Sequence, residues 1–193
     1  MKHNLHIRGF GFSLRPLCLD DAEFIVELRG DRQRSRFLHP IPASVEAQRD
    51  YVLKYFERPG DYYFVVEGQH QNTREGLVAI YEVDFQKRTA SWGRWILRPG
   101  SWASVECALR VYEAAFECLS LDEIRSQTYC ENPHVVSFHD RCGVPRHGVL
   151  PGYYNVDGIP IDVVEHVLTR ADWPRVRQIM EPMARKIAER LRD

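Results

Sequence analysis

The N-terminal part of the chain begins with alternating apolar and polar positions and continues with helical periodicity. The alternation covers residues 10–19 and predicts a strand. An acidic pair then precedes a segment up to Arg29 in which apolar residues recur every three or four positions, as in an amphipathic helix. A second helical segment starts at Ser44, a typical N-cap residue, and stops at the Pro-Gly pair 59–60. We therefore expect one strand followed by two helices.

The middle of the chain has the pattern of consecutive strands. Residues 62–67, 76–84 and 89–97 are rich in aromatic and β-branched side chains, which favour strands. The polar segments between these runs have the length of hairpin connections. The pattern predicts three consecutive antiparallel strands.

The helical period returns after the third of these strands. Residues 104–119 carry a wide apolar stripe, so this helix is expected to lie on a sheet. Residues 123–130 have a strand pattern. Residues 132–142 form a short helix with Asn132 as N-cap, a proline in its first turn and Gly143 after its end. A strand, a helix and a further strand in this order predict a parallel crossover.

The chain ends with a hairpin and a helix. Residues 144–154 and 159–169 are two strands joined around an Asp-Gly pair that fits a tight turn. The stripe of the terminal helix consists of Val176, Met180, Met183, Ile187 and Leu191. It is either the seam of a homodimer or a cover for the domain's own sheet. The whole pattern predicts an α/β fold with a mixed sheet in residues 10–170 and a C-terminal helix in residues 171–193.

The composition is that of a soluble globular protein, with 44% hydrophobic and 27% charged residues in a chain of 193. The 26 basic and 27 acidic residues leave a net charge of -1, so no overall field favours nucleic acid or an anionic membrane. No apolar run has the length of a membrane span, and the N-terminal residues lack the apolar core of a signal peptide. The five scattered cysteines are expected to be reduced thiols. We expect a cytoplasmic protein with no nucleic-acid partner and no membrane partner.

Two histidines and two cysteines around the short helix raise the question of a metal site. Cys130, His134, His139 and Cys142 are residue types that bind zinc. They lack the long loop that separates ligand pairs in zinc fingers, and the two histidines point apart on a helix. We therefore expect no metal site. The plain alternative is a packing helix whose apolar residues at 135 and 138 are buried.

The same segment resembles a motif of the GNAT acetyltransferases, which reads Asn-x-x-Ser/Ala-x-x-x-Tyr-x-x-x-Gly-Phe. Asn132, His139, Gly143 and Val144 stand at four of its positions, with His139 in place of the tyrosine and Val144 in place of the phenylalanine. Val135 replaces the small residue. The segment therefore matches the motif in spacing and in part of its residue types.

The resemblance extends beyond this motif. Residues 112–121 are similar to the Tyr-Ala-Phe-x-x-Leu-x-Leu helix end of the family, and the order of elements fits from residue 12 to residue 169. Downstream, the Asp-Gly pair and Asp162 resemble the family's hairpin. The resemblance implies the GNAT fold, which is a mixed central sheet of six to seven strands flanked by helices, here with a C-terminal helical extension.

The resemblance also implies a cosubstrate, acetyl-coenzyme A, whose acetyl group is taken by direct attack of an amine on the thioester. In the family, the pyrophosphate of the coenzyme binds at the start of the helix after the third hairpin strand, because backbone N–H groups there are unpaired and the helix dipole favours anions. The residues implied for binding are Ile96, Leu97, Arg98, Gly100, Ser101, Trp102, Ala103, Ser104, Asn132 and His139. Trp102 stands where the family has a small residue. A GNAT-fold binding protein that has lost coenzyme A is therefore an alternative.

Three titratable residues are candidates for the chemistry. By the resemblance, His139 stands where many members have a tyrosine general acid and would give a proton to the leaving thiolate. Glu82 and Asp84 lie near the end of the strand that precedes the last hairpin arm and are candidate bases for the amine. The alternative for both carboxylates is a solvated strand end, in which case a solvent chain would take the proton.

The acceptor is expected to be a small-molecule amine. Trp92 and Gly93, and likewise the segment 138–143, resemble the GNAT subgroup that acetylates amino groups of nucleotide-linked sugars. Trp92 is expected to line the acceptor site, since aromatic rings stack on sugars or bases, and Tyr129 is expected there because it lies near the end of the strand before Asn132. Both could instead belong to the core. The rival subgroup acetylates protein N-termini, as the ribosomal-protein enzymes do, and shares nearly all of the same elements.

Overall fold

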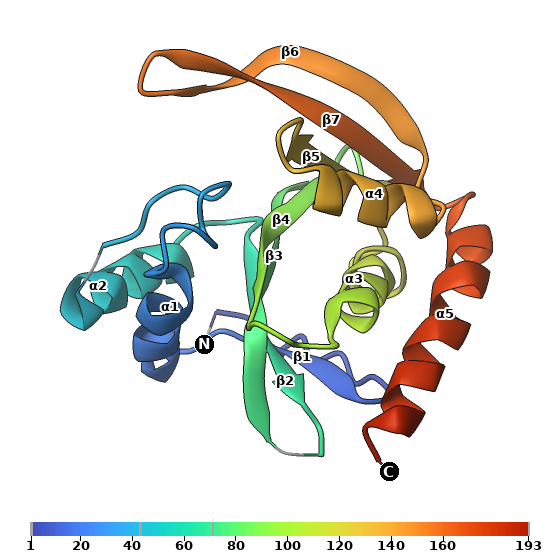
Figure 1. Cartoon of the computed structure of the whole chain (residues 1–193), viewed down its shortest axis with the longest axis horizontal. Helices are drawn as coiled ribbons and strands as arrows, with labels where there is room; N and C mark the ends of the chain where they lie inside the picture. The colour runs from blue at the N-terminus through green and yellow to red at the C-terminus, as the bar shows by residue number, and fades with distance from the viewer. Residues whose placement is uncertain (1, 43, 71, 193) are drawn as a thin grey trace.

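A mixed sheet of seven strands runs through the described part of the chain in the order β1-β2-β3-β4-β5-β7-β6 (Figure 1). The computed structural model describes residues 2–42, 44–70 and 72–192. The strands are β1 (Phe12–Pro16), β2 (Tyr62–Gly68), β3 (Thr73–Asp84), β4 (Thr89–Leu97), β5 (Glu123–Tyr129), β6 (Arg146–Val156) and β7 (Ile159–Thr169). The helices are α1 (Ala22–Arg29), α2 (Val45–Phe56), α3 (Ser104–Glu113), α4 (Pro133–Arg141) and α5 (Trp173–Arg190). The predicted α/β class and the predicted number of strands are confirmed.

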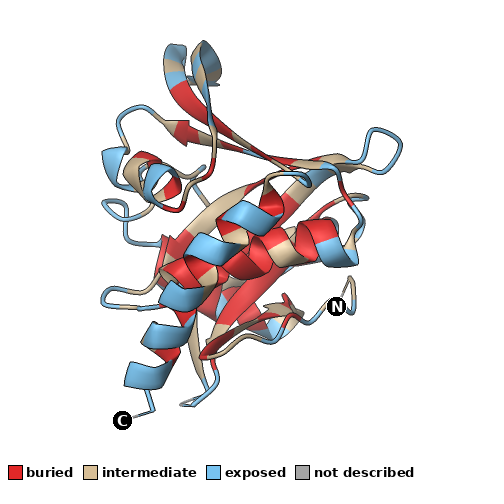
Figure 2. Ribbon diagram, turned by 90° about the vertical axis from the view of Figure 1, so that its right-hand side faces the viewer, coloured by how far each residue is buried: buried red, intermediate tan, exposed pale blue. Residues whose placement is uncertain are grey.

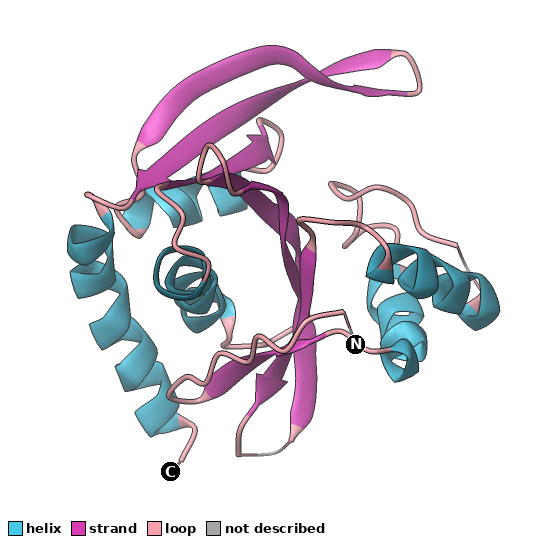
Figure 3. Ribbon diagram, turned by 180° about the vertical axis from the view of Figure 1, so that it is seen from behind, coloured by secondary structure: helices cyan, strands magenta, loops and turns pink. Residues whose placement is uncertain are grey.

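The helices cover both faces of this sheet. Figures 1 and 3 show α1 and α2 on one side of β3 and β4, and α3 with α5 on the other side. Two separate apolar clusters fill these layers, one between the sheet and α1–α2, the other between the sheet, α3 and α5. Burial of apolar side chains from both layers stabilises the sheet, because each buried residue removes apolar surface from water.

Among the strands of the described residues, only β4 and β5 pair in parallel, and their paired stretch is short. β4 and β5 are connected through α3, as the crossover pattern predicts, and pair in parallel at three positions that end with Ser91 and Arg125. β4 then continues to Leu97 and β5 to Tyr129 without further pairing between them. The two strands therefore separate toward their carboxyl ends, which is where ligands bind in open α/β sheets.

The helix ends agree with the sequence at two positions. The Ser44 side chain accepts a hydrogen bond of 3.1 Å from the backbone N–H of Ala47, as expected of an N-cap. Gly143 follows α4 with φ +76°, and a Cβ at this position would lie 2.6 Å from Cδ1 of Ile179 on α5. Glycine therefore both ends α4 and permits the approach of α5.

The helix predicted over residues 104–119 is regular only as far as Glu113. Ala114–Cys118 form a π-helical segment, in which the backbone N–H of Leu119 bonds to the carbonyl of Ala114 at 2.9 Å. A continuous apolar stripe does not distinguish the two kinds of helix, so this change of period is absent from the sequence pattern.

The buried face of α5 differs from the predicted stripe. Val176 and Met180 are buried as expected, and Ala184 and Ala188 continue this face, whereas the predicted Met183 and Leu191 are exposed. Figure 2 shows the resulting division of α5 into a buried inner face and an exposed outer face. Small residues are buried because α5 packs closely on α3. The stripe thus covers α3 of its own chain, and the predicted homodimer stays a prediction. Among the described residues, no helix has the length and apolar content needed to cross a membrane.

Candidate active site

A cavity of about 480 Å³ lies where β4 and β5 separate. The last paired residues are Ser91 and Arg125, and the lining of the cavity starts at the next residues, Trp92 and Ser126. Its other walls come from β3, β6, the start of α4 and the segment between α1 and α2. The divergence of the two parallel strands therefore creates the cavity.

One part of the cavity lining is basic. It carries the guanidinium groups of Arg29, Arg34, Arg58 and Arg94. Arg94 pairs with the buried Asp61 at 2.8 Å, and an exposed pair joins Arg34 to Asp31 at 3.2 Å. In the part of the chain that the structure describes, neither Arg29 nor Arg58 pairs with a carboxylate. The cavity thus holds more positive charge than its own carboxylates neutralise.

Another part of the cavity lining is aromatic. Tyr129 lies between two neighbours, with its ring centroid 5.9 Å from that of Phe37 and 5.7 Å from that of Tyr154. His39 stands edge-on to Tyr154 at 6.4 Å. Burial raises the pKa of the Tyr154 hydroxyl to about 12, so this group is neutral and serves as a hydrogen-bonding group. Such a wall can stack on a flat ring.

Both residues predicted for the acceptor site border this cavity. Tyr129 is half-buried and belongs to the aromatic side. Trp92 is only 2% exposed and packs against Trp95 and Tyr112, with ring centroids 5.5 and 5.6 Å away. Trp92 therefore has a core role as well as a place in the wall, so both interpretations that the sequence allowed apply to it. Contact of either residue with an acceptor stays a prediction.

The two predicted bases have different environments. Glu82 is exposed and lines the cavity, and its φ of +55° reflects an irregularity in the pairing of β3 with β4. Asp84 instead accepts hydrogen bonds of 2.9 Å from the backbone N–H groups of Gln86 and Lys87. These bonds, that of Lys87 first, hold the pKa of Asp84 below its ordinary value. Asp84 thus caps the turn after β3, and a role as base does not fit its position.

His139 lies in the core beside the cavity. It is 1% exposed, and its ring stands edge-on to Trp92 at 5.4 Å. Its Nδ1 is 3.5 Å from Oη of Tyr112, and its Nε2 is 3.5 Å from Oγ of Ser126. Burial, and next the neighbouring His166, lower the pKa of His139 to about 3.

This environment corrects the predicted role of His139. A side chain with a pKa of about 3 is a neutral imidazole at physiological pH and carries no imidazolium proton to donate to a thiolate. It is also absent from the cavity lining, unlike its helix neighbours Asn132 and Val135. The general-acid role, and direct binding of coenzyme A by this side chain, therefore do not fit the structure. Its motif position places it behind the wall formed by Trp92 and Ser126.

The loop predicted to bind the pyrophosphate is open on one side. Gly100 has φ +75°, and a Cβ built there would have no atom within 4 Å. The Trp102 side chain is 54% exposed, so the indole turns outward and does not fill the loop. The bulky residue that departs from the family pattern therefore leaves the backbone accessible.

The backbone N–H groups of this loop are satisfied in part. That of Ser101 donates to the Arg98 carbonyl at 3.2 Å, and that of Ala103 donates to Oγ of Ser101 at 3.3 Å. Among the described residues, the N–H groups of Ser104 and Val105, in the first turn of α3, have no hydrogen-bond acceptor. A helix start with unpaired N–H groups fits the diphosphate of coenzyme A.

The side chains of three other residues of the predicted coenzyme site are engaged within the protein. The Ile96 side chain is buried in the core, and Leu97 pairs with Gly76 at the end of β4. The Arg98 guanidinium binds Glu27 at 2.9 Å, so its charge is directed toward α1. Asn132 occupies the N-cap position of α4 without a side-chain capping bond and borders the cavity.

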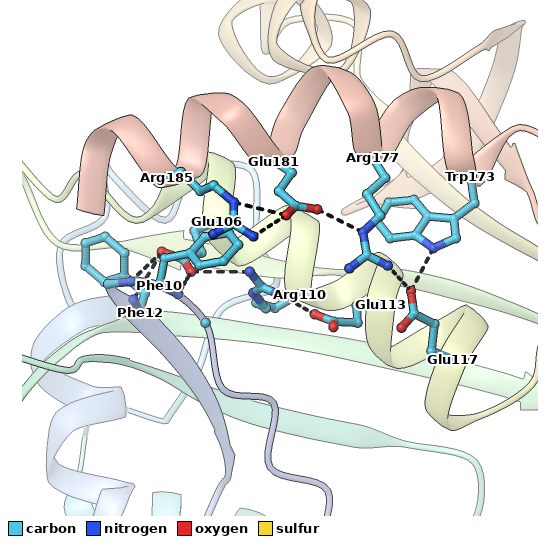
Figure 4. A network of polar contacts seen from close by, with 12 residues as sticks. Phe10, Phe12, Glu106, Arg110, Glu113, Glu117, Trp173, Arg177, Glu181 and Arg185 are labelled. Carbon is cyan, nitrogen blue, oxygen red and sulfur yellow. Dashed lines mark hydrogen bonds and ion pairs between the residues drawn. The ribbon is translucent and has the colours of Figure 1, made fainter. Parts of the chain in front are cut away.

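A carboxylate in the first turn of α3 is fully engaged by the N-terminal segment. Glu106 is 1% exposed and accepts hydrogen bonds from the backbone N–H groups of Phe10, Gly11 and Phe12, the last two at 3.0 and 3.1 Å (Figure 4). It also lies 3.5 Å from Arg110. These donors compensate its negative charge near the helix N-terminus, where an uncompensated carboxylate would repel a phosphate.

The four residues considered as zinc ligands do not meet. Cys130 and His134 are exposed, whereas His139 and Cys142 are buried. Within residues 2–42, 44–70 and 72–192, no group of three or more potential ligands has the arrangement of a metal site.

The basic side of the cavity has no counterpart among the site residues predicted from the sequence. Arg29 ends α1, Arg34 belongs to the following loop, Arg58 follows α2 and Arg94 lies in β4. The one local signal was the dense run of arginines in residues 29–36. This run has no apolar periodicity, so a pattern of strands and helices did not single it out.

Comparison with protein families matches the acetyltransferase (GNAT) domain over residues 12–144. Among solved structures, the spermidine N-acetyltransferase of Vibrio cholerae in complex with CoA and spermine is similar, with a TM-score of 0.76, 24% identity, and coverage of 86% of this chain and 99% of that one. A protein of T. thermophilus, itself only presumed to be an acetyltransferase, has a TM-score of 0.80 and 22% identity over 92% of this chain and 96% of its own. Comparison with curated proteins gives no match.

At these identities the solved structures establish the fold alone, whereas the family match covers well over half of the chain. The family expected from the spacing around Asn132 is thereby confirmed. The subgroup is not. The chain belongs to the GNAT acetyltransferases, enzymes that transfer the acetyl group of acetyl-coenzyme A to an amine.

Proposed function

We propose that this enzyme acetylates the amino group of a nucleotide-linked amino sugar. The observation that carries this proposal is the lining of the cavity at the separation of β4 and β5, which combines two arginines that have no carboxylate partner among the described residues with three neighbouring aromatic residues. A nucleotide-linked sugar combines a diphosphate with a flat base, which are the groups that such a lining attracts.

The reaction joins the amine nitrogen to the acetyl carbon and releases the coenzyme as a thiolate. The amine must be neutral to attack, so a base has to remove its proton. Glu82 is the carboxylate in the cavity wall and is assigned this role. The unpaired N–H groups at the start of α3 are assigned to the diphosphate of acetyl-coenzyme A.

A protein α-amine is the second candidate acceptor. The cavity lining includes the segment between α1 and α2 and Tyr154 of β6. The basic side favours an acidic terminus over a neutral or basic one. A flat ring fits the aromatic residues of the cavity better than a protein α-amine does.

The test is release of free coenzyme A by the purified protein with acetyl-coenzyme A and three acceptors: a UDP-linked amino sugar, a peptide with a free α-amine, and spermidine. We expect the highest kcat/KM for the UDP-linked amino sugar, by about tenfold or more, since buried charged contacts discriminate strongly. A peptide or spermidine that surpasses it would overturn the proposed acceptor. The family's chemistry would then remain and its acceptor would change.

A further inference from the structure

We propose that Arg29 and Arg58 form an anion-binding subsite of the acceptor cavity that takes phosphate oxygens. This inference deepens the proposed function by assigning the acceptor's diphosphate to two residues. The two arginines come from the ends of α1 and α2, and both line the cavity. Arg34 and Arg94 line it too, but each already has a carboxylate partner.

Arg29 provides the buried part of the subsite. It is only 8% exposed, and among the described residues it has no carboxylate partner. One Nη atom donates to the carbonyl of His39, while its buried Nε has no acceptor in the described part of the chain. A buried cation without a counter-ion is costly, and the cost is relieved when an anion arrives.

Arg58 provides the accessible part of the subsite. Its side chain is exposed, and its guanidinium lies over the ring of Tyr51 at 5.1 Å from the centroid. Tyr51 also lines the cavity, so this contact keeps the guanidinium at the cavity wall. A guanidinium carries a fork of N–H donors that matches phosphate oxygens.

The charge of this subsite excludes one class of acceptor. A polyamine would bring further positive charge beside two unpaired guanidinium groups, with Glu82 as the single carboxylate among the lining residues. Repulsion between like charges in a partly desolvated cavity weakens such binding. The subsite therefore selects amines that carry an anionic group.

The test is calorimetric titration of uridine 5′-diphosphate, and separately inorganic pyrophosphate, into the protein saturated with coenzyme A. Saturation keeps both probes away from the loop at the start of α3. We expect both probes to bind, and Arg58→Gln to weaken each by about tenfold or more, as expected when a charged hydrogen bond to phosphate is lost. Arg29→Gln should weaken them at least as much, with its thermal unfolding recorded because the residue is buried.

The matched control is the double variant Asp31→Asn/Arg34→Gln, which removes a cavity arginine together with its carboxylate partner and leaves the net charge unchanged. We expect less than a twofold change for this variant. Equal losses in this variant and in Arg58→Gln would overturn the subsite, because they would show that an unpaired charge is not what binds the probes. A wild-type protein that binds neither probe would also overturn it. Failure of the acceptor proposal looks different: probe binding would still depend on Arg58, but the UDP-linked amino sugar would not be acetylated.

Discussion

At the scale of single residues, two carboxylates of one strand have different roles, one chemical and one structural. Glu82 borders the cavity, whereas Asp84 is bound by two backbone N–H groups of the next turn. Because side chains alternate along a strand, residues two apart should share a face, but the pairing of β3 with β4 is irregular between Tyr81 and Asp84. Alternation alone therefore could not distinguish the two candidates.

The first prediction follows from this separation. Glu82→Gln keeps the shape of the side chain but removes the base, so kcat should fall by about 100-fold, within the range usual for loss of a general base. Affinity for acetyl-coenzyme A, measured by titration, should stay the same. Asp84→Asn is the control and should retain wild-type kcat. An unchanged kcat in Glu82→Gln would exclude this residue as the base.

The second prediction concerns the pH dependence of stability. The folded state holds His139 neutral, with a pKa of about 3 against an ordinary value near 6.5. Between these two values the unfolded chain binds a proton that the folded chain does not, so stability falls as the pH is lowered. From pH 7 to pH 5 this one residue should remove about 2 kcal/mol of the free energy of unfolding.

Urea unfolding of wild type and His139→Gln at both pH values measures this effect. The variant should lose less stability between pH 7 and pH 5, although part of the loss persists because burial also lowers the pKa of His3 and His166. The difference between the two pH values is compared, so any general effect of the substitution cancels. An equal loss in both proteins would show that His139 is not buried as a neutral side chain.

At the scale of elements, the start of α3 is the feature on which cosubstrate binding depends. Gly100→Ala should weaken acetyl-coenzyme A binding by about tenfold, because a Cβ at φ +75° strains the loop and enters its open side. Gly158→Ala is the matched control, since Gly158 also has positive φ and open surroundings but lies in the hairpin between β6 and β7. Titration should show no change for the control. Equal weakening in both variants would mean that backbone strain acts through stability alone.

A second element-scale prediction concerns how the N-terminal segment is fastened to α3 and α5. Phe10 is enclosed by Arg110 and Arg185, whose guanidinium carbons lie 4.6 and 4.0 Å from its ring centroid, and its backbone N–H reaches Glu106 (Figure 4). Glu106→Ala would leave three N–H groups without an acceptor. The free energy of unfolding should fall by about 3 kcal/mol, as measured by urea unfolding.

The control for this prediction is another glutamate of the same network. Glu181 joins Arg177 and Arg185 on the surface of α5, at 3.0 and 2.6 Å. Glu181→Ala should cost less than about 1 kcal/mol, because exposed ion pairs are screened by water. If both variants lost the same small amount of unfolding free energy, burial would not strengthen the hydrogen bonds of Glu106.

The elements themselves were largely accessible from the sequence, and the exceptions have physical reasons. Apolar residues at every second position place the strands, and apolar residues at every third or fourth position place the helices, because one face of each element must be buried. This periodicity does not show at which positions a neighbouring element approaches closely. On α5 the large Met183 is exposed and the small Ala184 is buried, because close packing on α3 favours small side chains.

At the scale of the whole molecule, the candidate site depends on contacts that no local pattern contains. The position of His139 followed from motif spacing, but its burial depends on Trp92 of β4, Ser126 of β5 and His166 of β7. The four cavity arginines likewise come from three separate parts of the chain, at residues 29–34, 58 and 94, and a net charge of -1 gives no sign that they gather at one place. Roles that depend on the local sequence were therefore predictable, whereas roles that depend on how the sheet brings distant residues together were not.

The charge of the assembled cavity leads to the last prediction, which concerns ionic strength. With acetyl-coenzyme A saturating, kcat/KM for an anionic acceptor should fall several-fold between about 50 and about 500 mM salt, because screening weakens attraction to the basic side. Spermidine should be a poor substrate whose kcat/KM rises over the same range, since salt then screens repulsion. Arg58→Gln should flatten the dependence for the anionic acceptor, whereas the double variant Asp31→Asn/Arg34→Gln should leave it unchanged because that pair carries no net charge. Initial rates of coenzyme A release at each salt concentration measure all of these slopes. If kcat/KM changed with salt in the same direction for the anionic acceptor and for spermidine, the charge of the cavity would not discriminate between them. Selection would then depend on shape alone.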